Sequence, residues 1–254
     1  MNANLEGTVA LVTGAGTGIG AAISRALAGD GAAVVLVGRR SAYLEEVAAQ
    51  IRASGGSASV FAADIAQRAQ AALAVEHAIS EFGRLDIVVN NAGVMHVGPV
   101  ADAPEGEWER MIDVNLNGTL YITQAAIPHL GESADAGPRR VADIVNISST
   151  AGRVARPGTA VYNLTKFGVN AFSEALRQEL QPRRVRVGVI EPGNVATDLV
   201  SHTRAELLES VQSQINSIER LVPEDIADAV TYMVGRPRRV AVNEMLVRAA
   251  DQSW

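Results

Sequence analysis

The sequence predicts an α/β fold in which one doubly wound parallel sheet of about seven strands carries helices on both faces. Three observations predict it. Short β-branched runs alternate with longer amphipathic stretches, the runs lack a two-residue alternation, and a glycine-rich turn follows the first run. Strands covered on both faces of a parallel sheet have this continuous apolar character, because neither face meets water.

The elements follow in a regular βαβ order. The expected strands are Val9–Val12, Val34–Val37, Ser59–Ala62, Ile87–Val89, Ile144–Ile147, Val185–Ile190 and Met245–Val247. The expected helices are Gly18–Gly29, Ser41–Ser54, Gln67–Phe82, Glu105–His129, Tyr162–Leu180 and Pro223–Val234. Right-handed crossovers would hold ligands at the carboxyl ends of the strands, near the point where the strand order reverses.

Two segments interrupt this order. Residues 131–140 contain Pro138 and two arginines, which predicts an exposed loop before the fifth strand. Residues 194–220 follow Pro192-Gly193 and include a polar, weakly amphipathic stretch, the place where a cover over a site would lie.

Composition limits the function classes. The chain has 254 residues, 48% hydrophobic and 20% charged, which favours one domain spanning 1–254. The net charge of −6 comes from interspersed acids and bases, so we expect no nucleic-acid partner. There is no cysteine, and the four histidines show no metal-site spacing, so we expect no metal. The N-terminus lacks a basic region followed by an apolar stretch, and we expect a cytoplasmic protein without membrane association.

A glycine turn comes directly after the first strand. Gly14, Gly18 and Gly20 open the first helix, the context in which such a turn binds a pyrophosphate. The first glycine permits the tight turn, the second lets the backbone approach phosphate, and the third allows close helix packing. The alternative is a plain strand-to-helix turn.

The end of the second strand indicates which dinucleotide binds. It reads Val37-Gly38-Arg39-Arg40, without the acid that usually accepts hydrogen bonds from the adenosine ribose. Arg39 could instead bond a 2′-phosphate and stack on adenine, which favours NADP(H) over NAD(H). The alternative is that both arginines begin the second helix as solvated residues.

Tyr162 and Lys166 are four residues apart and so share one face of a helix. A nearby ammonium stabilises a phenolate and lowers the pKa of the phenol. The pair therefore predicts a tyrosine that exchanges protons near neutral pH.

Four motifs in order resemble the short-chain dehydrogenase/reductase family, over nearly the whole chain. They are the turn Thr13-Gly14 to Gly20, Asn90-Asn91-Ala92-Gly93 after the fourth strand, Ser149 thirteen residues before Tyr162, and Pro192-Gly193 after the sixth strand. The C-terminal stretch from Pro223 to Glu244 is similar to NADP-dependent 3-hydroxy acid dehydrogenases and clavulanate dehydrogenase-like reductases. The resemblance implies a single Rossmann-type domain.

The resemblance also implies roles for individual residues. The catalytic group would be Asn115, Ser149, Tyr162 and Lys166, with Tyr162 as proton donor, Ser149 as its hydrogen-bonding partner on the substrate oxygen, Lys166 on the nicotinamide ribose and Asn115 fixing a water. Cofactor contacts would come from Gly14, Thr17, Gly18, Ile19, Gly20, Arg39, Arg40, Asp64, Ile65, Asn91, Ala92, Gly93, Tyr162, Lys166, Pro192, Gly193, Val195 and Thr197. Asp64 would bond the adenine amino group.

Several assignments keep alternatives. Ser148 could replace Ser149 as the acting serine, Asn117 could mark a bend in its helix, and Asp64 could only cap the following helix. His96 could face substrate or be structural. Arg153 and Arg156 could orient a substrate carboxylate or lie in a solvated loop. Leu164 takes a position often held by a small residue and could alter packing beneath the site.

These observations predict an NADP(H)-dependent oxidoreductase that transfers a hydride between the nicotinamide and a ketone or secondary alcohol. The alternatives are an NAD(H)-dependent secondary alcohol dehydrogenase and a silent dinucleotide-sensing protein. The resemblance further implies a homotetramer built on the helices of Asn115 and Tyr162, with which apolar residues such as Leu120 and Phe172 are compatible.

Overall fold

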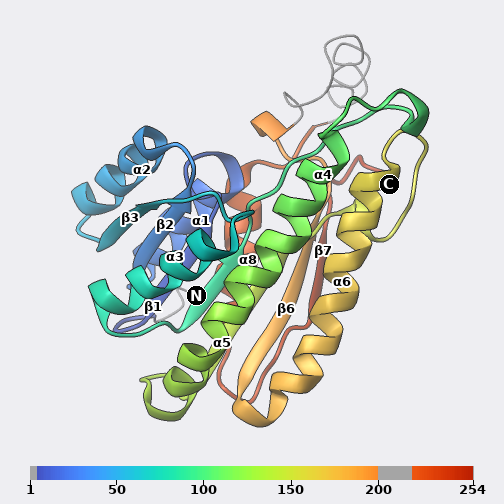
Figure 1. Cartoon of the computed structure of the whole chain (residues 1–254). Coiled ribbons are helices and arrows are strands. Elements are labelled where there is room, and N and C mark those ends of the chain that lie inside the picture. Colours follow the sequence, from blue (N-terminus) through green and yellow to red (C-terminus); the bar gives the residue numbers. More distant parts are fainter. Residues whose placement is uncertain (1–4, 200–218, 254) are drawn as a thin grey trace.

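A parallel sheet organises the protein (Figure 1). The computed structural model describes residues 5–199 and 219–253, and within them seven strands pair in parallel. The strands are β1 (Val9–Thr13), β2 (Ala33–Gly38), β3 (Ala58–Ala62), β4 (Ile87–Asn90), β5 (Ala142–Ile147), β6 (Val185–Pro192) and β7 (Glu244–Val247). Their order is β3-β2-β1-β4-β5-β6-β7, so the direction of winding reverses between β1 and β4. The predicted doubly wound fold is confirmed.

Helices cover both faces of this sheet (Figure 1). One face carries α1 (Gly18–Gly29), α2 (Ser41–Ala53) and α8 (Pro223–Val234), and the other carries α3 (Arg68–Phe82), α5 (Thr119–Ala136) and α6 (Ala160–Leu180). Each face has its own apolar core. Ile23 and Ile226 lie in the first core, whereas Ile122 and Leu176 lie in the second. Because both faces are covered, the strands read as continuous apolar runs.

The expected helix over Glu105–His129 differs from the structure in its middle. It consists of α4 (Glu107–Ile112), a π-helical turn (Asp113–Gly118) and the start of α5. Both Asn115 and Asn117 lie in the π turn, where the Asn117 amide donates to the Asp113 carboxylate at 2.9 Å. π turns of this kind are frequent at functional sites.

The exposed loop predicted over residues 131–140 is mostly wrong. Helix α5 continues to Ala136, and the turn begins only at Gly137. The extra helical turn buries Leu130 and Ala134 in the second core. This burial outweighs the weak helix propensity of the glycine at the start of the segment.

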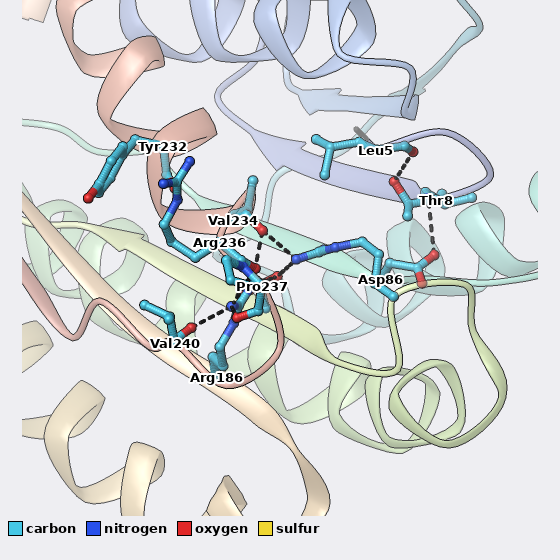
Figure 2. A network of polar contacts seen from close by, with 12 residues as sticks. Leu5, Thr8, Asp86, Arg186, Tyr232, Val234, Arg236, Pro237 and Val240 are labelled. Atoms are coloured by element: carbon cyan, nitrogen blue, oxygen red, sulfur yellow. Dashed lines mark hydrogen bonds and ion pairs between the residues drawn. The ribbon is translucent and has the colours of Figure 1, made fainter. Parts of the chain in front are cut away.

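The amino ends of the strands are held together by arginines. Arg139 and Arg186 both bond the buried carboxylate of Asp143 on β5, at 2.7 Å each. Arg186 also donates to the backbone carbonyls of Val234 and Val240, which closes the carboxyl end of α8 (Figure 2). This network lies at the amino ends of the strands. The predicted motifs lie at the opposite edge of the sheet, at the carboxyl ends, where the network does not reach.

Candidate active site

A cleft runs along the carboxyl ends of the strands, across the reversal between β1 and β4. It is lined by residues from the loops after β1 to β6, including Gly14, Arg39, Asp64, Asn91, Ser149 and Pro192. Ligands of open α/β sheets bind at this position. The structure thus brings together motifs that are far apart in the sequence.

The glycine turn connects β1 to α1 through a left-handed backbone conformation that glycine adopts readily. Gly14 has a φ of 66°, which residues with a Cβ atom rarely adopt. A Cβ atom on Gly20 would lie 2.3 Å from the Gly14 carbonyl oxygen, so α1 packs directly against the turn. Thr17, Gly18 and Ile19 line the cleft, and the first turn of α1 carries no acidic side chain. The positive end of the helix dipole is therefore open to an anion.

The two arginines after β2 differ in their surroundings. Arg40 directly precedes α2 and its guanidinium stacks 4.3 Å from the centre of the Tyr43 ring. Arg39 is exposed, lines the cleft and makes no hydrogen bond or ion pair with the described part of the chain. Its charge is thus available to an anionic ligand.

The turn after β3 places Asp64 and Ile65 in the cleft. The Asp64 carboxylate accepts from the backbone N–H of Ala66 at 3.1 Å and pairs with Arg110 on α4 at 3.1 Å. The residue that precedes α3 is Gln67, so Asp64 is not its N-cap. Asp64 orders the turn itself and keeps its side chain beside the cleft.

The segment after β4 is fixed to β1. The Thr13 hydroxyl accepts from the backbone N–H groups of Asn91 and Ala92 at 3.0 Å each, and the Asn91 amide donates to the Thr13 carbonyl at 2.9 Å. A Cβ atom on Gly93 would lie 3.9 Å from the Lys166 amine, so Gly93 lies near the predicted catalytic group. The segment thus lies between the part of the cleft with the glycine turn and the part with Tyr162 and Lys166.

Ser149 and Tyr162 meet at one end of the cleft. Ser149 follows β5, and its hydroxyl forms a hydrogen bond with the Tyr162 phenol. The neighbouring Ser148 is buried and its hydroxyl donates to the Lys166 carbonyl at 3.3 Å. The structure thus places Ser149, and not Ser148, beside the phenol.

Lys166 lies one helical turn after Tyr162. Its amine donates to the Ile147 carbonyl at 2.9 Å and lies 5.7 Å from the centre of the Tyr162 ring. Both side chains are buried, with 5% exposed. They therefore form a compact pair on the face of α6 that points into the cleft.

The predicted effect of this lysine on the tyrosine does not appear. Burial raises the pKa of Tyr162 to about 12, and the hydrogen bond with Ser149 lowers it only in part. Burial also lowers the pKa of Lys166 to about 8. The same desolvation disfavours both charged forms, so without cofactor the phenol stays protonated at neutral pH.

Asn115 fixes the wall opposite α6. Its amide accepts from the Val94 N–H at 2.8 Å and donates to the Val94 carbonyl at 2.9 Å and to Thr165 at 3.1 Å. The Thr119 hydroxyl donates to the Asn115 backbone carbonyl at 2.9 Å. The π turn thus ties the loop after β4 to α6.

The loop after β6 closes the remaining side. Pro192, Gly193, Val195 and Thr197 all line the cleft. The Ala196 N–H donates to the Leu221 carbonyl at 2.8 Å, which joins both sides of residues 200–218. The predicted cover over 194–220 lies largely outside the described residues.

Gly20 and Asn115 lie behind the cleft and do not line it, and four other predicted residues are not brought to it either. Arg153 pairs with Glu191 and Glu244, at 2.6 and 2.7 Å, and so is not available to a substrate carboxylate. Leu164 is 59% exposed on the outer side of α6, so the expectation that it packs beneath the site is wrong. His96 and Arg156 are not among the described residues that line the cleft.

Sequence reasoning missed two features of α6. Asn163 has all its hydrogen-bonding capacity used on the segment before α6: it donates to the carbonyls of Ala151 and Val154 and accepts from Arg156 and Thr159. No spacing in the sequence predicts these hydrogen bonds of Asn163.

The second feature was visible in the sequence. Of the 22 lysines and arginines in the chain, Lys166 is the single lysine.

The cleft fits a dinucleotide. An open helix N-terminus, a glycine turn with no room for side chains and an arginine without a partner among the described residues would meet the phosphates, and Tyr162 with Lys166 lies at the far end. No group of three or more potential metal ligands occurs in the described ranges. Fold and site together define a dinucleotide-dependent oxidoreductase.

Comparisons with known proteins agree. The sequence profile of the short chain dehydrogenases matches residues 8–208. An uncharacterized oxidoreductase of Methylorubrum extorquens is 41% identical over 247 residues, covering 95% of this chain and 96% of that protein. A 3-ketoacyl-(acyl-carrier-protein) reductase from Brucella melitensis, complexed with NADH, has a TM-score of 0.83 at 36% identity, over 96% of this chain and 97% of that one. A short chain dehydrogenase from Burkholderia cenocepacia in complex with NADP has a TM-score of 0.83 at 31% identity, with the same coverage.

The chain belongs to the short-chain dehydrogenase/reductase family. It is an oxidoreductase that uses a nicotinamide dinucleotide. Among the described residues, no helix is both long and apolar enough to span a membrane.

Proposed function

We propose that the protein is an NADP(H)-dependent carbonyl reductase that also oxidises the corresponding secondary alcohol. The observation that carries this proposal is the cluster of Ser149, Tyr162 and Lys166 at one end of a dinucleotide cleft. When bound, the nicotinamide supplies or accepts the hydride. The residues of the chain supply the proton and hold the oxygen.

Each member of the cluster suits one task. In reduction, negative charge grows on the substrate oxygen, so hydrogen-bond donors aimed at it lower the barrier. Tyr162, protonated at neutral pH, donates the proton, and Ser149 bonds the same oxygen. Lys166 keeps ammonium donors for the nicotinamide ribose beyond its bond to Ile147. Asn115 holds the wall that faces them and, we infer, a water that relays protons.

The remaining cleft residues hold the dinucleotide. Gly14, Thr17, Gly18 and Ile19 take the pyrophosphate at the start of α1, whereas Gly20 is buried behind them and lets α1 pack against the turn. Asp64 and Ile65 take the adenine, and Arg39 and Arg40 its ribose phosphate. Asn91, Ala92, Gly93, Pro192, Gly193, Val195 and Thr197 flank the nicotinamide half.

The similar structures do not decide between the two cofactors, because one holds NADH and another holds NADP. The proposed preference for NADP(H) therefore rests on Arg39. We expect Arg39→Asp to reverse the charge that meets the 2′-phosphate. The ratio of kcat/KM for NADPH to that for NADH should fall about a hundredfold, which parallel assays with the two cofactors measure.

Arg238→Asp is the matched control, since Arg238 is exposed on the turn after α8 and does not line the cleft. An unchanged ratio in Arg39→Asp would remove the basis for the NADP(H) preference.

A panel of ketones and secondary alcohols, followed by nicotinamide absorbance with both cofactors, tests the proposed reaction. Turnover of ketones and 3-hydroxy acids supports it. Cofactor binding without turnover across the whole panel would favour the silent dinucleotide-sensing alternative.

We further propose a homotetramer in which α5 and α6 meet their counterparts in a second copy. The two helices lie side by side (Figure 1), and their outer faces expose Leu120 (39%), Leu164 (59%) and Phe167 (43%). Phe172, expected to contribute, instead packs partly buried against the second core.

Leu164→Glu would bury a carboxylate in that interface, which is costly without a partner. We expect the variant to lose at least half of its assembled mass in sedimentation, whereas Leu73→Glu, on α3 at 50% exposure, should not. An unchanged mass for Leu164→Glu would place the interface elsewhere.

A further inference from the structure

Arg110 and Asp64 form an ion pair at the end of the cleft away from Tyr162. The Arg110 guanidinium on α4 lies 3.1 Å from Asp64 Oδ2, and both residues line the cleft. The other oxygen, Oδ1, accepts from the Ala66 N–H at 3.1 Å, and the Asp64 backbone N–H donates to the Gln70 side chain at 2.8 Å. The carboxylate is therefore fixed at both of its oxygens.

The turn that carries Asp64 also packs on the π turn that follows α4. Ile65 is buried, and a Cβ atom on Gly118 would lie 2.7 Å from its Cδ1 atom. The same π turn carries Asn115. Because Arg110 and Gly118 belong to one continuous segment, the turn after β3 is held against it at two points.

The ion pair contributes little to folding. The side chains of Arg110 and Asp64 are 30% and 28% exposed, and partly exposed pairs of this kind contribute at most about 1 kcal/mol. What the pair does fix is the direction of the carboxylate. An ionised carboxylate has about four acceptor positions, and the two contacts within the chain leave the others for a ligand donor.

We propose that Arg110 is a positioning residue for the cofactor, which holds the free acceptor positions of Asp64 toward the exocyclic amino group of adenine. The inference rests on the proposed function, in which Asp64 binds that group. A carboxylate that is already oriented loses less freedom on binding than one that rotates in solvent. Without Arg110, the carboxylate would be held only at Oδ1 by the Ala66 N–H, and Oδ2 would turn toward water.

The test compares NADPH with its hypoxanthine analogue, in which an oxygen replaces the exocyclic amino group. Binding is measured directly by calorimetry, and turnover separately. We expect Arg110→Met, which keeps the bulk of the stem and removes the charge, to raise Kd for NADPH about five- to tenfold. Its Kd for the hypoxanthine cofactor should change less than about twofold, and kcat should stay within about twofold of wild type.

Arg68→Met is the matched control. Arg68 lies on α3 outside the cleft, with its guanidinium on Gln124 and near the Tyr121 ring, and its loss should affect neither cofactor. An equal loss of affinity for both cofactors in Arg110→Met, or no loss for either, would overturn the positioning role.

Asp64→Asn separates this inference from the function on which it rests. We expect the variant to lose the wild-type preference for NADPH over the hypoxanthine cofactor, because an amide can bond either group. If Asp64→Asn kept that preference in full, the assignment of Asp64 to adenine would itself be wrong. If it lost the preference while Arg110→Met behaved like wild type, only the role of Arg110 would fail.

Discussion

Tyr162→Phe is expected to lower kcat about a thousandfold while leaving affinity for NADPH unchanged. The substitution removes one hydroxyl from a buried ring, and that hydroxyl is the proton donor in the proposed reaction. General acid catalysis contributes about a hundred- to ten-thousandfold to enzymatic rates. Steady-state kinetics with a good ketone, together with calorimetric binding of NADPH, measures both quantities.

The fold of this variant should be intact, because phenylalanine keeps the ring that packs with Val94, Met111 and Val114, and only the hydroxyl beside Ser149 is lost. Thermal unfolding within a few degrees of wild type checks this. Turnover close to the wild-type rate would refute a role for Tyr162 as the acid.

Lys166→Met is expected to have a different signature, because Lys166 is assigned two tasks. The variant should lose turnover as Tyr162→Phe does, and should in addition bind NADPH about tenfold more weakly, since the ribose loses its ammonium donor. A loss of kcat with unchanged affinity would refute the ribose contact.

The same variant should be more stable than wild type at neutral pH. Burial lowers the pKa of Lys166 from 10.5 in the unfolded chain to about 8 in the fold, so below pH 8 the folded protein carries an unfavourable buried charge. That cost diminishes as the pH rises from 8 to 10.5, where the unfolded chain also loses its proton. We expect a gain of roughly 1–3 kcal/mol at pH 7 that has largely vanished near pH 10.5, measured by urea unfolding at both values.

The strands of the sheet were predictable, because the residues within each strand alone indicate that it is buried on both faces. Runs such as Val34–Val37 are apolar at every position, and a strand covered on both faces requires this. The glycine turn was equally direct, since Gly14 and Gly20 stand where the backbone conformation and the packing of α1 exclude side chains.

Other features depend on partners that are distant in the chain. Arg153 resembles a substrate anchor in the sequence, yet its partners Glu191 and Glu244 come from β6 and β7. Similarly, the ion pair of Arg110 joins residues 46 positions apart, and no local pattern indicates it. Side-chain pairing across elements is fixed only when the fold is known.

The pKa of Tyr162 shows a further limit. Helical spacing correctly places Lys166 beside it, but spacing carries no information on burial. Both side chains are 5% exposed, and desolvation determines the direction of both shifts. Geometry along one helix was predictable, whereas the electrostatics of its surroundings was not.

The single lysine permits a direct measurement of the central claim, that a buried amine beside Tyr162 meets the cofactor. Protein grown with lysine labelled by carbon-13 at Cε gives one side-chain NMR resonance, that of Lys166. We expect its titration to have a midpoint at a pKa of about 8, and the resonance to shift when NADP(H) is added. A midpoint near the ordinary lysine value, with a resonance that does not respond to cofactor, would contradict the account.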